Sequence, residues 1–162
     1  MFGRQTCRYA LHLVFIFSSV LQISLGLENK SEGSFRDYVE IEGITYYVST
    51  GFVNRENAFS ECRVRGMNLV SFEGGQWMSV ASWLRNNGLS NNWFWTGGLR
   101  PENSPTWIWE SSGQPITDFH WEHDQPSGNG STSRFCIDFN LDFGGWDDDD
   151  CLSNYYFGYI CK

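Results

Sequence analysis

Cysteines place the strongest constraint on how this chain can fold. The 162-residue sequence holds five of them, and Cys7 lies inside an apolar N-terminal segment. The other four are spread over the rest of the chain: Cys62, Cys136, Cys151 and Cys161. An even number of cysteines in an exported chain indicates two disulfides, and the spacing leaves three pairings open. The set contains no C-x₂-C pair, which disfavours a zinc site built from thiolates.

The N-terminal segment is typical of a secretory signal peptide. Two arginines precede an apolar run over residues 11–25, which ends in small residues before a cleavage position after Gly26. The run is shorter than the roughly 20 residues of a membrane-spanning helix, so we expect secretion to the extracellular space and no membrane span. The length of the remainder suits one domain. The predicted divisions are a signal peptide at 1–26, an N-terminal leader without regular structure at 27–40 and a folded domain at 41–162.

The charge balance and two glycosylation sequons bear on the partners of the chain. The formal net charge is −8, and loss of Arg4 and Arg8 with the signal peptide would make it −10. Nucleic acid is disfavoured as a partner because binding it needs a basic patch, which the sequence lacks. Sequons at Asn29 and Asn129 predict N-linked glycans on exposed loops.

Hydrophobic patterning predicts an α+β domain. A β-branched and aromatic strand is expected over 44–48, followed by a helix over 55–65 with Asn54 as its cap. A second helix is indicated by apolar residues at positions 77, 80, 81 and 84. After Gly88 the pattern changes to short aromatic strands between turn-rich loops, with an acidic turn at 147–150. The expected strands are 93–96, 106–109, 135–139 and 155–161.

Several short motifs resemble those of the C-type lectin-like domains, and they occur in the same order. They are Trp95-Thr96-Gly97-Gly98-Leu99, Trp107-Ile108-Trp109, Gln125-Pro126, Gly145-Trp146-Asp147-Asp148 and Tyr159-Ile160-Cys161. The resemblance covers roughly residues 41–162 and implies a short, secreted, single-domain member of that family. It implies two helices, small antiparallel sheets, a long irregular loop and the disulfides Cys62–Cys161 and Cys136–Cys151.

The resemblance also implies a binding site. In sugar-binding members of the family, calcium links the protein to two sugar hydroxyls. The motifs place the metal ligands at Gln125, Asp147 and Asp148, with Ser127 joining these three as a carbohydrate-binding residue. Gln125 is associated with galactose-type members, and a cis peptide bond is expected before the proline that follows it. Two positions depart from the pattern: Ser127 replaces an acid or amide, and Arg134 replaces a glutamate, which lowers the ligand charge on which calcium affinity depends.

Other residues allow two interpretations. Five tryptophans lie in core motifs of the family, so packing is expected for Trp95, Trp107, Trp109, Trp121 and Trp146. The run His120-Trp121-Glu122-His123-Asp124 contains residue types that bind zinc, but it lacks a third ligand at a set spacing. We interpret this run as the loop that leads to Gln125, in which two histidines would be sensitive to pH.

Two function classes remain. The first is a secreted protein that binds carbohydrate, leaning towards galactose, with calcium as cofactor and glycans or glycoproteins as partners. The alternative is a calcium-independent domain that binds extracellular proteins, in immune recognition or in organisation of the extracellular matrix or cuticle. An enzyme is disfavoured, because the disulfides would use all four cysteines, no G-x-S-x-G motif occurs, and the paired acids share one acidic turn.

Overall fold

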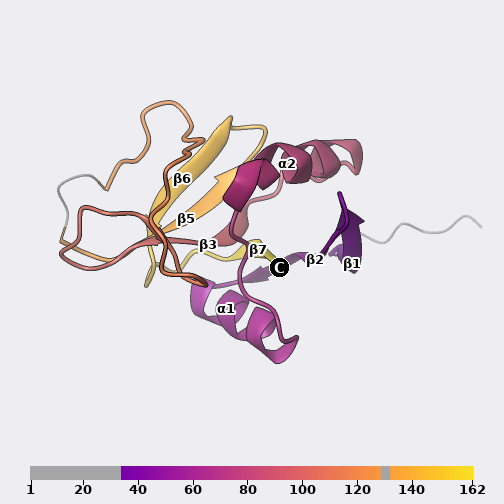
Figure 1. Cartoon of the computed structure of the whole chain (residues 1–162), viewed down its shortest axis with the longest axis horizontal. Helices are drawn as coiled ribbons and strands as arrows, with labels where there is room; N and C mark the ends of the chain where they lie inside the picture. Colours follow the sequence, from indigo (N-terminus) through magenta and orange to yellow (C-terminus); the bar gives the residue numbers. More distant parts are fainter. Residues whose placement is uncertain (1–33, 129–131) are drawn as a thin grey trace, which may run out of the picture. The chain divides into compact units, whose positions relative to one another are not determined.

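The computed structural model describes residues 34–128 and 132–162. The predicted signal peptide and the sequons at Asn29 and Asn129 lie outside these residues and stay predictions. The helices and strands follow one another along the chain in an α+β order (Figure 1). They are β1 (Arg36–Ile41), β2 (Ile44–Val53), α1 (Arg55–Val64), the short helix η1 (Glu73–Gly75), α2 (Gln76–Asn86), β3 (Phe94–Arg100), β4 (Ile108–Trp109), β5 (Phe135–Asn140), β6 (Gly145–Asp150) and β7 (Phe157–Cys161).

Both predicted helices are present, and local chemistry sets where each begins. The Asn54 side chain accepts a hydrogen bond from the backbone N–H of Asn57 at 2.9 Å, which satisfies one free donor at the start of α1. Helix α2 begins directly after Gly74 and Gly75, whose φ angles are 68° and 84°. Only glycine adopts this left-handed conformation without strain, so this pair turns the chain into α2.

The strands join in one sheet. Its order is β1-β2-β7-β3-β5-β6, and β4 pairs with β3. Strands β3 and β7 run parallel to each other, whereas the other strand pairs are antiparallel. The carboxyl-terminal strand therefore lies in the middle of the sheet, between β2 and β3.

The core forms two layers, one on each face of the sheet. Successive residues of the central strands belong to different clusters, as expected from the alternation of side chains along a strand. Val48 and Phe94 pack with the buried residues of α2, whereas Tyr47 and Trp95 pack with those of α1. The two helices consequently cover opposite faces of the sheet (Figure 1).

Both disulfides implied by the resemblance are confirmed. Cys62–Cys161 joins α1 to β7, with the two Cα atoms 5.4 Å apart. Cys136–Cys151 joins β5 to the residue that follows β6, with a Cα separation of 5.0 Å. The first bridge closes a long loop and the second a short one, and each restricts the unfolded chain more than the folded one.

The leader predicted over 27–40 is partly a strand. Residues 36–40 belong to β1, which forms a hairpin with β2. The turn between them consists of Glu42 and Gly43, both with positive φ (51° and 78°), a conformation whose twist matches that of paired strands. Strand β1 is mostly exposed and carries several charged residues, so its sequence lacks the apolar pattern that predicts a strand.

The acidic turn predicted at 147–150 is wrong, because these residues form most of β6. Every residue of β6 is paired with one of β5, from Gly145 opposite Asn140 to Asp150 opposite Phe135. The fully buried Trp146 anchors the strand in the core. Pairing and this anchor hold four consecutive aspartates in an extended conformation that their charge disfavours.

The predicted packing role of the tryptophans is confirmed. Four of the five are buried, namely Trp95, Trp107, Trp109 and Trp146. Trp121 is partly buried and packs against the same core, 5.1 Å from the Trp107 ring. None of the helices within the described ranges is long and apolar enough to cross a membrane.

Candidate functional site

The loop that carries Gln125 runs beside β6. Its backbone pairs with Trp146 through two hydrogen bonds, from Trp146 N to His120 O at 2.8 Å and from Glu122 N to Trp146 O at 2.9 Å. The peptide bond between Gln125 and Pro126 is cis, as expected from the resemblance. This pairing brings a loop more than twenty residues distant in sequence alongside the aspartates of β6.

Glu122, Gln125 and Asp147 form the first group of site residues. The Gln125 side chain hydrogen-bonds Glu122, and this lowers the pKa of Glu122. Burial, followed by the charge of Asp147, raises that pKa more strongly. Glu122 Oε2 and Gln125 Oε1 are buried and have no hydrogen-bond partner among the residues described. Two oxygen acceptors beside a further carboxylate are therefore left without a donor.

Asp148 belongs to a second group, with the segment that follows Pro126. Its Oδ1 accepts the backbone N–H of Ser127 at 2.5 Å, and its Oδ2 accepts that of Gly128 at 3.0 Å. Burial raises the pKa of Asp148, and these hydrogen bonds oppose the rise. Asp148 is only 3% exposed. Its carboxylate thus fixes the main chain of the loop.

Arg100 holds the same segment from another side. Its Nη2 donates to the carbonyl of Gly128 at 3.1 Å, and its guanidinium lies 5.1 Å from the centre of the Phe135 ring. A Cβ atom at Gly128 would lie 2.7 Å from Asp148 Oδ2 and 2.5 Å from Phe135 Cε1. Glycine is required here because only a residue without a side chain lets the backbone approach this closely.

The structure divides the four predicted binding residues between these two groups. Gln125 lies with Asp147, and Ser127 lies with Asp148. Asp147 and Asp148 are successive residues of β6, so their side chains leave opposite faces of the strand. The two groups are linked by one further hydrogen bond, from Asp148 N to Asp147 Oδ1 at 2.7 Å.

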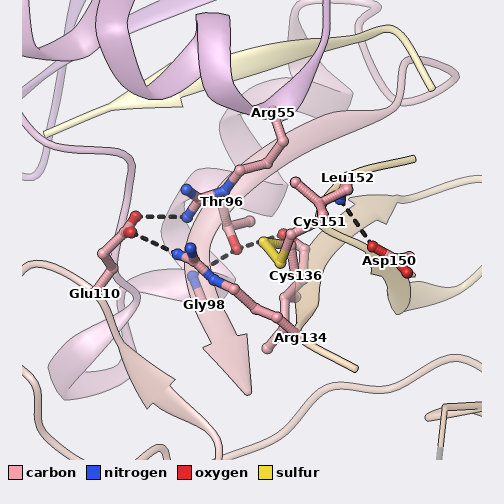
Figure 2. Close-up of a disulfide and its surroundings, with 10 residues drawn as sticks. Arg55, Thr96, Gly98, Glu110, Arg134, Cys136, Asp150, Cys151 and Leu152 are labelled. Atoms are coloured by element: carbon pink, nitrogen blue, oxygen red, sulfur yellow. Dashed lines mark hydrogen bonds and ion pairs between the residues drawn. A yellow bond between two sulfur atoms is a disulfide. The ribbon is translucent and has the colours of Figure 1, made fainter. Parts of the chain in front are cut away.

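Arg134 turns towards Glu110 (Figure 2). Its Nη2 lies 2.9 Å from Glu110 Oε1, and the other oxygen of Glu110 lies 2.6 Å from Arg55 Nη2. A cation at this position would oppose a nearby metal ion unless it paired with an acid. Arg134 is paired in this way with Glu110, which lies in the loop after β4.

A pair of acids lies behind Asp147 on the same face of the β5–β6 hairpin. Asp138, opposite Asp147 in the ladder, is fully buried, and burial raises its pKa well above the usual range. Burial, and next the charge of Asp147, raises the pKa of Asp149 to about 6. Neither carboxylate oxygen of Asp138 has a hydrogen-bond partner among the described residues, so burial and the neighbouring negative charges favour its protonated form.

The run from His120 to Asp124 does not form a zinc cluster. His120 lies 3.3 Å from Asp118, and His123 is almost fully exposed beside Asp124. No three His, Cys, Asp or Glu side chains within 34–128 and 132–162 are arranged to hold a metal ion. Within this run, Glu122 is the residue that interacts with Gln125, and the sequence analysis did not identify it as a site residue. Glu122 directly follows Trp121, whose bridge to Trp146 is a long-range pairing that no local sequence pattern indicates.

Comparison with known proteins decides the family. Residues 53–162 match the family model described as "Lectin C-type domain". The chain belongs to this family. This C-type lectin domain shares 25% identity over 130 residues with C-type lectin domain family 4 member M of Hylobates lar, and the match spans 78% of this chain but only 30% of that protein. It shares 28% identity over 131 residues with lectin BRA-3 of Megabalanus rosa, covering 78% and 75% of the two chains.

Solved structures agree on the fold of the lectin domain. The carbohydrate-recognition domain of the mouse scavenger receptor C-type lectin superposes with a TM-score of 0.62 at 22% identity. The match covers 76% of this chain and 92% of that one. At this identity the likeness establishes the fold alone.

Proposed function

We propose that this lectin domain binds carbohydrate beside the Gln125 loop, with calcium held by Gln125, Glu122 and Asp147. The observation that carries the proposal is the pair of buried oxygens, Gln125 Oε1 and Glu122 Oε2, that lack a partner among the described residues beside Asp147. Buried acceptors without a donor are rare in proteins, and a bound cation accounts for both.

The donor set fits calcium and not zinc. Calcium prefers hard oxygen ligands, and this set offers two carboxylates and one amide oxygen. When bound, calcium supplies open coordination places for two neighbouring sugar hydroxyls. Glu122 restores the acid that the chain lacks at Arg134. Because the protein ligands carry only two negative charges, we expect a dissociation constant of about 10⁻⁴–10⁻³ M, as in other extracellular calcium modules.

The wider setting of the proposal is extracellular. Galactose is the preferred sugar because Gln125 matches the galactose-type pattern, and Ser127 contributes a neutral hydroxyl at the edge of the site. Two disulfides support an oxidising compartment, consistent with the predicted signal peptide at 1–26. Glycans or glycoproteins are the proposed partners, and Asn29 and Asn129 are the proposed glycosylation sites.

Retention on galactose beads tests this function. The protein should carry Asn129→Gln, so that no glycan next to the loop blocks access. We expect retention in millimolar calcium, release by EDTA, and no retention on mannose beads. Asp147→Asn should abolish retention, whereas Glu102→Gln, a matched change at an exposed acid outside the site, should not.

One observation favours the second candidate, a calcium-independent domain that binds extracellular proteins. Asp148, which the resemblance places among the metal ligands, is already occupied by the N–H groups of Ser127 and Gly128. A folded protein that ignores galactose in both calcium and EDTA would favour this candidate.

A further inference from the structure

A cavity of about 290 Å³ lies at the start of α1, outside the Gln125 site. It is lined by Arg55, Phe59, Glu110 and Arg134, and by Cys151 and Leu152 beside the second disulfide. Figure 2 shows that both arginine side chains reach the same carboxylate, that of Glu110. We refer to this feature as the Arg55–Arg134 cavity.

Glu110 neutralises only one of the two guanidinium charges. Arg55 and Arg134 each contact one oxygen of this single carboxylate, at 2.6 and 2.9 Å. Burial lowers the pKa of Arg55, Glu110 raises it, and the charge of Arg134 lowers it further. The two cations therefore repel each other across Glu110, and an anion in the cavity would relieve this repulsion.

The cavity also offers hydrogen-bond donors. Arg55 is only 5% exposed, yet its Nε has no acceptor among the residues described. A buried N–H of a charged group without an acceptor is costly, and an acceptor oxygen on a bound ligand would remove this cost. The side chain of Arg134 is 46% exposed, so part of its planar guanidinium faces solvent. A planar guanidinium suits carboxylate and sulfate oxygens, which it contacts through two parallel bonds.

Apolar groups lie next to these donors. The guanidinium of Arg55 lies over the Phe59 ring, with 5.9 Å between the guanidinium carbon and the ring centre. Leu152 is 87% exposed and lines the same cavity. A pyranose ring that carries an acidic group presents both an anion and an apolar C–H face, and so matches both parts of the lining.

We propose that the Arg55–Arg134 cavity binds an acidic sugar unit, whose carboxylate or sulfate group contacts the two guanidiniums. This site is separate from the proposed galactose site and does not require calcium. Glu56, an exposed residue in the first turn of α1, also lines the cavity and forms no ion pair within the described residues. The Glu56 carboxylate carries the same charge as the proposed ligand and would repel it, so Glu56→Gln should tighten binding.

Titration of monosaccharides in EDTA, followed by NMR, tests the proposal apart from the calcium site. Glucuronate and N-acetylglucosamine 6-sulfate distinguish carboxylate from sulfate as the acidic group. Glucuronamide and N-acetylglucosamine are their neutral controls. We expect saturable binding of at least one acidic sugar, weakened by added salt and not shared by its neutral control. Arg134→Gln should weaken it at least about tenfold. Arg85→Gln, at an exposed arginine on α2, should leave it unchanged.

Three results would overturn the proposal. They are equal binding of a neutral control, full binding by a folded Arg134→Gln variant, and no saturable binding of either acidic sugar. Acetyl-aspartate amide serves as a peptide probe in the same titration, and in the third case binding of this probe would identify an acidic peptide as the ligand. Arg134 is half exposed, so its replacement leaves the core intact and tests the cavity itself.

Discussion

Asp148 shows how one residue of a binding motif can serve the main chain of its own protein. Its two oxygens accept the N–H groups of Ser127 and Gly128, and Arg100 holds the carbonyl of Gly128. Asp148 and Arg100 therefore fix the loop after the cis proline from two sides. Asp148 does this without acting as a metal ligand. The proposed calcium site then depends on the neighbouring group of Glu122, Gln125 and Asp147.

Removal of the Asp148 carboxylate should lower stability. Asp148→Ala leaves the N–H groups of Ser127 and Gly128 without this acceptor, and that of Gly128 is buried, so the free energy of unfolding should fall by about 1–3 kcal/mol. Urea denaturation in EDTA measures the change, with Asp142→Ala at an exposed aspartate as the control. A variant as stable as the control that has lost its response to calcium would instead make Asp148 a metal ligand.

The sequence could predict part of the site. Gln125 and Asp147 stand in recognisable motifs, and the cis proline follows from the same resemblance. Glu122 could not be placed, because its position near Gln125 and Asp147 depends on the pairing of residues 120–122 with Trp146. Likewise, no local pattern indicates that Arg134 pairs with Glu110, since that contact needs both loops in place.

At the scale of elements, the β5–β6 hairpin keeps several acids close together. Local pattern predicted helices α1 and α2 and most strands, because each carries a periodic apolar face and clear end signals. It missed β6, whose sequence alone reads as a charged turn. The strand exists because β5 satisfies its backbone and Trp146 is buried, which are both long-range effects. The consequence is a group of acids with raised pKa values on one face of the hairpin.

These acids should make the protein less stable as pH rises through their folded pKa values. The pKa of Asp149 is about 6 in the folded chain, against 3.8 as its ordinary value. The folded state therefore binds the proton more tightly than the unfolded state. The resulting stabilisation is present below about pH 4 and is lost as pH rises through about 6. At neutral pH, Asp149→Asn should raise the free energy of unfolding, by of order 1 kcal/mol after allowance for solvent screening.

Urea unfolding in EDTA at about pH 4.5 and about pH 7.5 measures this dependence on both sides of the transition. Asp149→Asn should flatten the difference between the two conditions, whereas Asp142→Asn should leave it as in the unmodified protein. Identical pH profiles for Asp149→Asn and the unmodified protein would show that Asp149 does not titrate in this range.

At the scale of the whole domain, the regular elements form a frame, and the loops supply most residues of the proposed sites. The sheet, the helices on its two faces and the Cys62–Cys161 bridge form the frame. The long segment between β3 and β5 supplies Glu110, Glu122, Gln125 and Ser127 to the two proposed sites. The resemblance predicted both disulfides, but the parallel contact of β3 with β7 had no local signal, because it joins residues more than 60 positions apart.

Calcium titration by calorimetry measures whether Gln125, Glu122 and Asp147 hold a calcium ion. Three proteins are compared: the unmodified chain, Glu122→Gln in the site, and Glu102→Gln as the exposed control. We expect one calcium ion per unmodified chain, with a dissociation constant of about 10⁻⁴–10⁻³ M. Glu102→Gln should bind equally well, and Glu122→Gln at least about tenfold more weakly. No calcium binding by the unmodified chain, or equal binding by Glu122→Gln, would show that Glu122, Gln125 and Asp147 do not form a calcium site.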